Sequence, residues 1–332
     1  TIDNLNELDV VLSNGDTAHY SSLNWDQIKK KMSHQNFDAK IYQKLFEIGR
    51  VNRDEILSRY PKILRRVGGY NLDEVVQEGD FNMARFVVGS EGTLVTITEA
   101  KLRIVPSPKL KALVVIHFND LISAMEATVV TLDLEPSAVE LIDSTIICQA
   151  QLSSQYSRMM DFMEGSPEAL LLVELVDDSE ASLISRIASL NQIMRQSNLG
   201  YSIRHFMNQE DQARIWAVRK AGLGLMMSMP GDIKPLPFVE DTAVSPEHLP
   251  KFVKRFDEII KYHGSTAGFY GHASVGCLHI RPFLNLKRKD DVDRMVSISN
   301  QISDLVLEFG GAMSGEHGDG LVRSGWNEKM FG

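Results

Sequence analysis

Residues 110–117 are Leu110-Lys111-Ala112-Leu113-Val114-Val115-Ile116-His117, an almost uninterrupted apolar run of the length of a strand. A segment with helical periodicity follows at residues 121–132, and a second short apolar run occupies residues 138–142. Short apolar runs bounded by turn residues are typical of buried strands, and longer periodic segments are typical of helices. This part of the chain therefore predicts a strand, a helix and a second strand in succession.

The same order of elements recurs further along the chain. Residues 169–176 form another apolar run, residues 180–196 another helical segment, and residues 201–206 another strand-like run. Two successive strand–helix–strand units predict an α+β fold in which a large antiparallel sheet is covered by helices on one face, in ferredoxin-like units. We expect this domain to continue through helices 208–228, 246–263 and 288–308 and strands 237–244, 267–272 and 277–282.

A smaller group of elements precedes this domain. The segment from Leu8 to Tyr20 predicts a hairpin, because Asn14-Gly15 between two strand-like runs is a strong turn signal. Residues 25–58 are helical in period, and residues 86–106 predict a strand, a glycine turn and two more strands. Prolines at 106 and 108 then indicate a boundary. The predicted domains are 1–108 and 109–308, with 309–332 as a separate C-terminal segment.

The composition limits the class of protein. Hydrophobic residues make up 43% of the chain and charged residues 24%, which is typical of a soluble globular protein with a substantial core. A net charge of −9 argues against general nucleic-acid binding, and the sequence has no apolar run long enough to span a membrane. Two cysteines, Cys148 and Cys277, exclude a disulfide framework, a zinc-ribbon site and an iron–sulfur cluster within these residues, and they suit a reducing cytoplasm.

Ionisable side chains gather in two glycine-rich stretches near the C-terminus, 270–279 and 309–320. His272 and His279 occupy strand-like segments on either side of a short turn, where two neutral imidazoles could bind a divalent metal ion. Two half-buried histidines bonded to backbone carbonyls are an equally good interpretation. Glu316 and His317 add a carboxylate and a third imidazole, a pattern of catalytic metal sites, although a solvated turn is the alternative.

Two cations are candidates for binding an anionic substrate. Lys234 lies among prolines and apolar residues just before a predicted strand, so it would be rigidly presented as a point charge for a carboxylate. A lysine in a surface loop is the simpler interpretation. Arg219 lies on a predicted helix beside Trp216, and from the sequence alone we favour a solvated charge there.

The glycine turn Gly89-Ser90-Glu91-Gly92-Thr93 offers backbone N–H groups and a hydroxyl, a plausible anion-binding nest. It is not followed by a predicted helix, so it is not a dinucleotide-binding fingerprint of the GxGxxG kind.

These motifs together resemble one family, the FAD-linked oxidases of the vanillyl-alcohol-oxidase type, in the branch of D-lactate and D-2-hydroxyglutarate dehydrogenases. Residues 89–100 are similar to the family segment GSEGTLGIITEA, and the two C-terminal stretches are similar to GHxGDGNLH and GEHG. The sequences of residues 271–282 and 237–244 resemble those of the large bacterial D-2-hydroxyacid dehydrogenases, in which the flavin part is fused to an iron–sulfur part. The resemblance implies that 1–108 is the second half of an FAD domain, that 109–308 is a substrate-binding cap, and that 309–332 returns toward the FAD domain.

The resemblance also implies a role for individual residues. It implies hydride transfer from a D-2-hydroxy acid to FAD, with a divalent metal, zinc or manganese, assisting deprotonation of the hydroxyl. His317 would take the hydroxyl proton, and Arg219 and Lys234 would bind the substrate carboxylate. The implied metal ligands are His272, His279 and Glu316. The implied flavin-contacting positions are Gly89, Ser90, Gly92, Thr93, Leu94 and Ile97.

Several features depart from the family pattern. Val95 stands where the family usually has glycine, and Cys277 and residues 273–275 replace an Asp-Gly-Asn element. The pyrophosphate-binding subdomain is not in the sequence, so we expect a fragment with an incomplete FAD site. An iron–sulfur cluster is expected only in a missing C-terminal part. The expected location is the cytoplasm, either free or peripheral to the inner membrane. The sequence is compatible with a homo-oligomer, and it does not identify the electron acceptor.

Two other functions compete with this hypothesis. A metal-dependent hydrolase or metal-binding module would use His272, His279 and Glu316 but would have no use for the glycine turn at 89–93. A non-catalytic fragment that packs against a partner is the third alternative.

Overall fold

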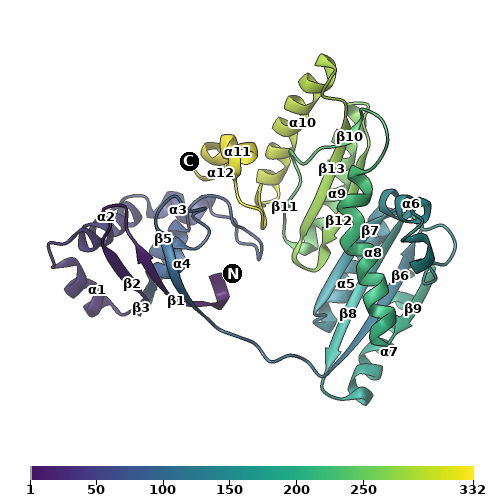
Figure 1. Cartoon of the computed structure of the whole chain (residues 1–332), viewed down its shortest axis with the longest axis horizontal. Helices are drawn as coiled ribbons and strands as arrows, with labels where there is room; N and C mark the ends of the chain where they lie inside the picture. Colours follow the sequence, from purple (N-terminus) through teal and green to yellow (C-terminus); the bar gives the residue numbers. More distant parts are fainter. Residues whose placement is uncertain (1) are drawn as a thin grey trace. The chain divides into compact units, whose positions relative to one another are not determined.

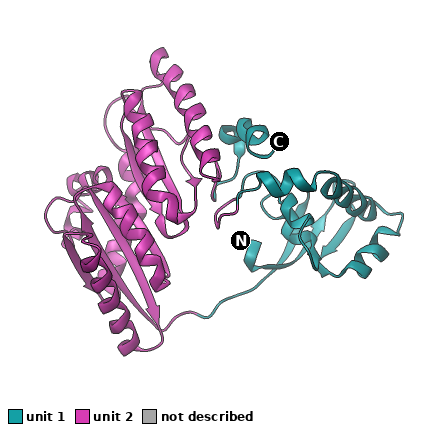
Figure 2. Ribbon diagram, turned by 180° about the vertical axis from the view of Figure 1, so that it is seen from behind, with its two compact units in different colours: residues 1–61, 67–106, 316–332 teal, residues 62–66, 107–315 magenta. Residues whose placement is uncertain are grey.

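The computed structural model describes residues 2–332, which fall into two compact units (Figure 2). Unit 1 contains Thr1–Pro61, Val67–Pro106 and Glu316–Gly332, and unit 2 contains Lys62–Arg66 and Ser107–Gly315. The division after Pro106 falls beside the predicted boundary, whereas the predicted C-terminal segment 309–332 is divided between Gly315 and Glu316. Among the described residues, no helix is long and apolar enough to cross a membrane.

Unit 2 is built on an eight-stranded sheet whose strands all pair antiparallel (Figure 1). The strand order is β10-β13-β12-β7-β8-β6-β9, and β11 pairs with β13. Its strands are β6 (Leu110–Phe118), β7 (Ala138–Asp143), β8 (Ala169–Asp177), β9 (Ser202–Phe206), β10 (Lys234–Pro235), β11 (Thr242–Ala243), β12 (Ala267–His272) and β13 (Cys277–Leu284). The part β7-β8-β6-β9, with one helix between β6 and β7 and another between β8 and β9, is a ferredoxin-like unit, as predicted.

Helices cover both faces of this sheet rather than the single face predicted. The α-helices are α5 (Leu121–Thr131), α6 (Ser144–Leu152), α7 (Glu180–Gln196), α8 (Gln209–Met227), α9 (Leu249–Tyr262) and α10 (Lys289–Glu308). Short 3-10 turns occupy η3 (Leu132–Leu134), η4 (Ser157–Met159), η5 (Pro246–His248) and η6 (Ala273–Val275). Buried residues of α6 and α8, such as Ile146 and Val218, share one core with Leu113 and Leu172 of the sheet.

The opposite face carries the second group of helices. Side chains alternate between the two faces along a strand, so Val114 and Leu171 point away from the α6–α8 core. Helices α5, α7, α9 and α10 pack beside one another over these fully buried residues. We call the other surface, which bears α6 and α8, the α8 face; Tyr270 belongs to its core.

Unit 1 is smaller and contains the predicted N-terminal hairpin. A three-stranded sheet has the order β2-β1-β5, and a two-stranded sheet joins β3 to β4. The elements are η1 (Ile2–Asn4), β1 (Leu5–Val11), β2 (Thr17–Tyr20), β3 (Ser22–Leu23), α1 (Trp25–Met32), α2 (Phe37–Val51), α3 (Arg53–Arg59), η2 (Leu72–Val75), β4 (Phe81–Asn82), α4 (Met83–Val87), β5 (Thr96–Leu102), α11 (Gly320–Arg323), η7 (Ser324–Trp326) and α12 (Asn327–Phe331).

Three predicted strands are wrong. In place of the two strands predicted between the glycine turn and Pro106, the structure has the single strand β5. The run at Phe86 and Val87 ends the short helix α4, because the Asn82 side chain caps it by accepting from the N–H of Ala84 at 2.9 Å. The run 237–244 contributes to the sheet only through β11, with β10 just before it. Asp241 adopts a left-handed backbone conformation (φ 69°), which interrupts the extended chain between them.

Candidate functional site

The hairpin β12–β13 carries both predicted metal-binding histidines. The register pairs Tyr270 with His279 and His272 with Cys277, so the two imidazoles lie at diagonal positions on the α8 face. Their ring centroids are 5.4 Å apart, in an edge-to-face arrangement. The turn depends on Gly276, which has a φ of +71° and on which a Cβ would overlap the carbonyl oxygen of Val244. Glycine at this position therefore allows the turn that joins the two histidine-bearing strands.

A buried carboxylate lies at one end of this hairpin. Asp241 is fully buried; its Oδ2 accepts from the Ser314 hydroxyl at 2.7 Å and its Oδ1 accepts from the Cys277 thiol at 3.3 Å. Its backbone carbonyl accepts from the N–H of Gly315 at 2.7 Å. A Cβ on Gly315 would lie 2.6 Å from the Cys277 sulfur, so glycine allows this close approach. These contacts fix the residue that immediately precedes Glu316 against Asp241.

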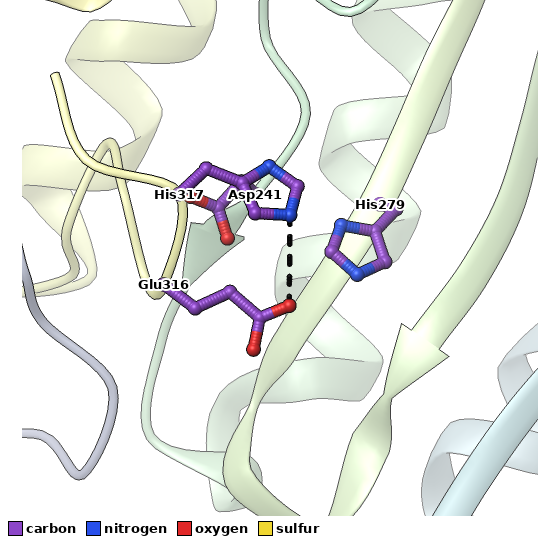
Figure 3. Close-up of side chains that lie close together, drawn as sticks. All are labelled: Asp241, His279, Glu316 and His317. Carbon is purple, nitrogen blue, oxygen red and sulfur yellow. Dashed lines mark ion pairs between the residues drawn. The ribbon is translucent and has the colours of Figure 1, made fainter. Parts of the chain in front are cut away.

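Four side chains form a group with metal-binding character (Figure 3). Asp241, His279, Glu316 and His317 each offer one ligand atom, and these atoms all lie within 4.8 Å of one another. Glu316 Oε1 lies 3.6 Å from His317 Nε2. Two imidazoles and two carboxylates suit a borderline divalent ion such as zinc, and also manganese. The donor set thus fits a divalent metal.

The group overlaps the predicted ligand set without matching it. His279 and Glu316 belong to both, and His317, predicted as the base, lies in the same group. His272 is outside the group, and its Nδ1 lies 2.7 Å from Glu140 Oε1. The sequence analysis did not identify Asp241. It could have been found because it lies in segment 237–244, which carries part of the family resemblance.

Arg219 is buried, so the interpretation as a solvated charge is wrong. It lies on α8 with 9% of its surface exposed, and its Nη2 and Nε donate to Glu140 Oε2 at 2.7 and 3.0 Å. Its guanidinium also lies over the ring of Tyr270, 5.1 Å from the centroid. Arg219 and His272 thus share one carboxylate.

Tyr270 contacts both Arg219 and His279, since the Arg219 guanidinium lies over its ring and its ring centroid is 5.0 Å from that of His279. Burial raises the pKa of Tyr270 above its ordinary value, against the lowering effect of Arg281. The hydroxyl therefore stays protonated at neutral pH. Arg281, two residues after His279, forms its own buried ion pair with Glu240 at 2.6 Å.

Lys234 lies on β10 and pairs with Leu284 of β13. Its Nζ donates to the carbonyl of Met229, just after the end of α8. Lys234 thus lies beside the C-terminal end of the helix that bears Arg219.

In unit 1 the glycine turn lies beside a surface hollow of about 320 Å³. Of the predicted flavin-contacting positions, Gly89, Ser90, Gly92 and Ile97 line this hollow. Thr93 instead closes the turn, because its hydroxyl donates to the Ser90 carbonyl at 2.6 Å. The lining of the hollow combines glycines with apolar side chains such as Val95 and polar ones such as Glu91.

The turn is tied to the loop that bears His317. The Glu91 carboxylate accepts from the N–H groups of Asp319 at 2.6 Å and Gly320 at 3.4 Å, and Asp319 Oδ2 accepts from the N–H of Gly69 at 2.7 Å. Gly318 has a φ of +85°, and a Cβ there would overlap Glu91 Oε1. Unit 1 therefore holds the predicted flavin-contacting turn and the predicted base in one hydrogen-bonded assembly. No local sequence pattern indicates the bond between Glu91 and the backbone of Asp319.

Comparison with known proteins identifies relatives along the whole chain. Residues 107–332 match the family described as FAD linked oxidases, C-terminal domain. The chain is 32% identical over 308 residues to the D-2-hydroxyglutarate dehydrogenase of Pantoea ananatis, covering 89% of this chain and 30% of that protein. The Escherichia coli protein of the same name is 31% identical over 308 residues, with coverage of 89% and 30%. The chain thus spans about a third of the length of these relatives.

The fold has a counterpart among solved structures. p-Cresol methylhydroxylase superposes with a TM-score of 0.56 at 12% identity, covering 99% of this chain and 59% of that chain. At this identity the likeness concerns the fold alone. Together with the family match, it confirms the predicted fold class, a mixed helix-and-sheet structure with a large antiparallel sheet.

Proposed function

Because the chain belongs to the FAD-linked oxidase family, we propose that it takes part in the FAD-dependent oxidation of a D-2-hydroxy acid to the 2-oxo acid. The observation that carries the proposal is the bond between Glu91 and the backbone of Asp319, which ties the glycine turn to the loop of His317. Relatives named D-2-hydroxyglutarate dehydrogenase suggest the substrate class. D-2-Hydroxyglutarate and D-lactate are the substrates to test first.

The residues of this chain have proposed roles in binding and proton transfer. His317 takes the proton of the substrate hydroxyl, since a neutral imidazole is the commonest general base in enzymes. Arg219 and Lys234 bind the substrate carboxylate and so orient the reacting carbon. Bound FAD supplies the hydride acceptor, and the positions proposed to contact it are Gly89, Ser90, Gly92, Thr93, Leu94 and Ile97.

A divalent ion, zinc or manganese, is proposed at His279 and Glu316, with His272 as the third ligand and Asp241 as the further carboxylate that the geometry adds. When bound, the ion would lower the pKa of a coordinated hydroxyl. Elemental analysis and chelator titration of the active protein test this part. Full activity without any divalent metal would remove the ion from the proposal.

His317→Ala tests the proton transfer. A general base contributes roughly 10²- to 10⁴-fold to a rate, so the variant is expected to lose turnover of D-2-hydroxyglutarate by that factor while FAD stays bound. His205→Ala is the matched control, because His205 lies on β9 and contacts Asn191. Unchanged turnover in His317→Ala would contradict its role.

A metal-dependent hydrolase is the second candidate, because the group of Asp241, His279, Glu316 and His317 would suit it equally well. The visible absorbance spectrum of the protein, purified from its native host, distinguishes the two candidates. A bound flavin favours the dehydrogenase; a metal without flavin, together with hydrolysis of an ester or amide, favours the hydrolase.

A further inference from the structure

One buried carboxylate joins two of the residues with proposed roles. Glu140 Oε1 lies 2.7 Å from His272 Nδ1, and Oε2 accepts from Arg219 Nη2 at 2.7 Å and from Nε at 3.0 Å. The side chain of Glu140 is 10% exposed and that of Arg219 11%. All three residues belong to unit 2. The chain Arg219–Glu140–His272 is therefore internal to one compact body.

Secondary structure fixes each member of this chain. Glu140 on β7 and His272 on β12 are register partners on adjacent strands, so their side chains leave the sheet side by side. Arg219 reaches the same point from α8, and its guanidinium lies over the ring of Tyr270. A buried ion pair is held firmly where its hydrogen bonds are satisfied, and here each carboxylate oxygen has its own partner.

The arrangement selects one form of the histidine. A carboxylate only accepts hydrogen bonds, so the contact at 2.7 Å requires a proton on His272 Nδ1. In the neutral imidazole the lone pair then resides on Nε2. Histidine ligands in metal sites commonly donate their other ring N–H to a carboxylate in this way, which orients the ring.

We propose that Glu140 is a positioning residue for both neighbours. It fixes the Nδ1–H tautomer of His272, so that Nε2 is the ligand atom, and it engages one N–H of Nε and one of Nη2 of Arg219. The two N–H groups of Nη1 and the second N–H of Nη2 are then the donors left for the substrate carboxylate. The identities of the metal and the substrate rest on the proposed function, whereas the tautomer follows from unit 2 alone.

The tautomer is measured directly by long-range ¹H–¹⁵N NMR on the full chain labelled with ¹⁵N-histidine, with His272→Gln used for assignment. The wild type is expected to show a protonated Nδ1 and an unprotonated Nε2. Glutamine has a single acceptor oxygen, which Arg219 claims in Glu140→Gln, so the amide NH₂ faces His272 and the Nε2–H tautomer is expected. An Nε2–H tautomer in the wild type would overturn the proposal.

Metal affinity is a second readout, measured by competing Zn²⁺ against a chromophoric chelator. Glu140→Gln is expected to weaken zinc binding by about 10- to 100-fold, the usual effect of losing the partner of a histidine ligand. Glu174→Gln is the control; it removes a carboxylate from neighbouring strand β8, where Glu174 contacts Ser137 and Lys111. Affinity in the wild-type range is expected for this control, and the same result for Glu140→Gln would contradict the role of Glu140.

A double variant separates positioning from loss of structure. In Arg219→Met with Glu140→Gln, the amide oxygen no longer has to serve an arginine and can accept from His272 Nδ1, so zinc affinity is expected to recover. Failure to recover would show that Glu140 only supports the fold. If Glu140→Gln does not fold, Glu140→Asp takes its place, because the shorter side chain cannot span both partners. Absence of zinc binding in the wild type would sink the proposed metal site, while the tautomer would still decide the role of Glu140.

Discussion

The hairpin β12–β13 and the glycine turn at residues 89–93 hold their functional groups by different means. Around the hairpin, buried charged side chains hold one another: Glu140 with Arg219 and His272, and Glu240 with Arg281. At the turn, most partners of the carboxylates are backbone N–H groups, those of Asp319 and Gly320 on Glu91 and that of Gly69 on Asp319. The side-chain amide of Asn327 is a further donor to Asp319.

This difference predicts different sensitivities. Where charged side chains pair with one another, removing one charge is strongly destabilising, because its partner is left buried and unpaired. Where backbone N–H groups are the donors, substitution of the donor residues' side chains has little effect, but a shift of the loop removes the hydrogen bonds. The predictions below test the hairpin and its surroundings in unit 2 and the glycine turn in unit 1.

Gly276 is the position of the hairpin at which adding a Cβ is expected to be most destabilising. Gly276→Ala is expected to lower the free energy of unfolding by about 3 kcal/mol, since the left-handed conformation strains alanine and the new Cβ meets the Val244 carbonyl. Denaturant unfolding measures the loss. Gly264→Ala is the matched control, with a φ of +67° and open space around its Cβ, and about 1 kcal/mol is expected there. Equal losses in the two variants would refute the contact with Val244.

Gly318→Ala tests the backbone-mediated region. Alanine there would be strained and would displace the Glu91 carboxylate, so a loss of about 2 kcal/mol is expected for unit 1. Because the obstacle is the end of a side chain, Glu91→Ala should relieve part of the cost. A double-mutant cycle is expected to give a cost for the pair that is smaller than the sum of the single losses. Strict additivity would mean that Glu91 does not govern the loop of His317.

The pH dependence of unfolding should report on a buried carboxylate of unit 2 that contacts strand β12 of the hairpin. Burial raises the pKa of Asp143, at the N-terminus of α6, to about 6, against hydrogen bonds from Phe269 and Ile146 that lower it. The folded state thus binds this proton more tightly than the unfolded chain, so the contribution stabilises unit 2 at low pH and is lost as the pH rises from about 4 through about 6.

The expected loss is roughly 1 kcal/mol between pH 5 and pH 7. Denaturant unfolding of the wild type and of Asp143→Asn across this range measures it, because the asparagine variant cannot show this component. Parallel pH profiles for the two proteins would contradict a raised pKa at Asp143.

Much of the scaffold was predictable because its elements carry strong local patterns. The apolar runs of β6 and β8 and the periodic segments of α5 and α7 have the lengths and turns of their types, and they fold accordingly. Prediction failed at Phe86, where a capped helix replaced a strand, and at Asp241, where a left-handed residue divided an extended run. Both outcomes depend on single polar side chains rather than on hydrophobic periodicity.

The candidate site shows the same limit. His279, Glu316 and His317 were recognisable from their glycine-rich surroundings, and the structure groups them. The burial of Arg219 was not recognisable, because its partner Glu140 lies 79 residues away on a different element. Long-range pairing of charges leaves no local trace in a sequence, and it decides which charged residues face the solvent.

The proposal that the protein oxidises a D-2-hydroxy acid is tested most directly by anaerobic reduction of its flavin. D-2-Hydroxyglutarate, D-lactate and their L-enantiomers are added in turn to the FAD-loaded protein while the visible flavin absorbance is followed. We predict bleaching by at least one D-enantiomer and none by its L-counterpart. A flavin that no D-2-hydroxy acid bleaches, or a protein that binds no flavin, would contradict the proposed function.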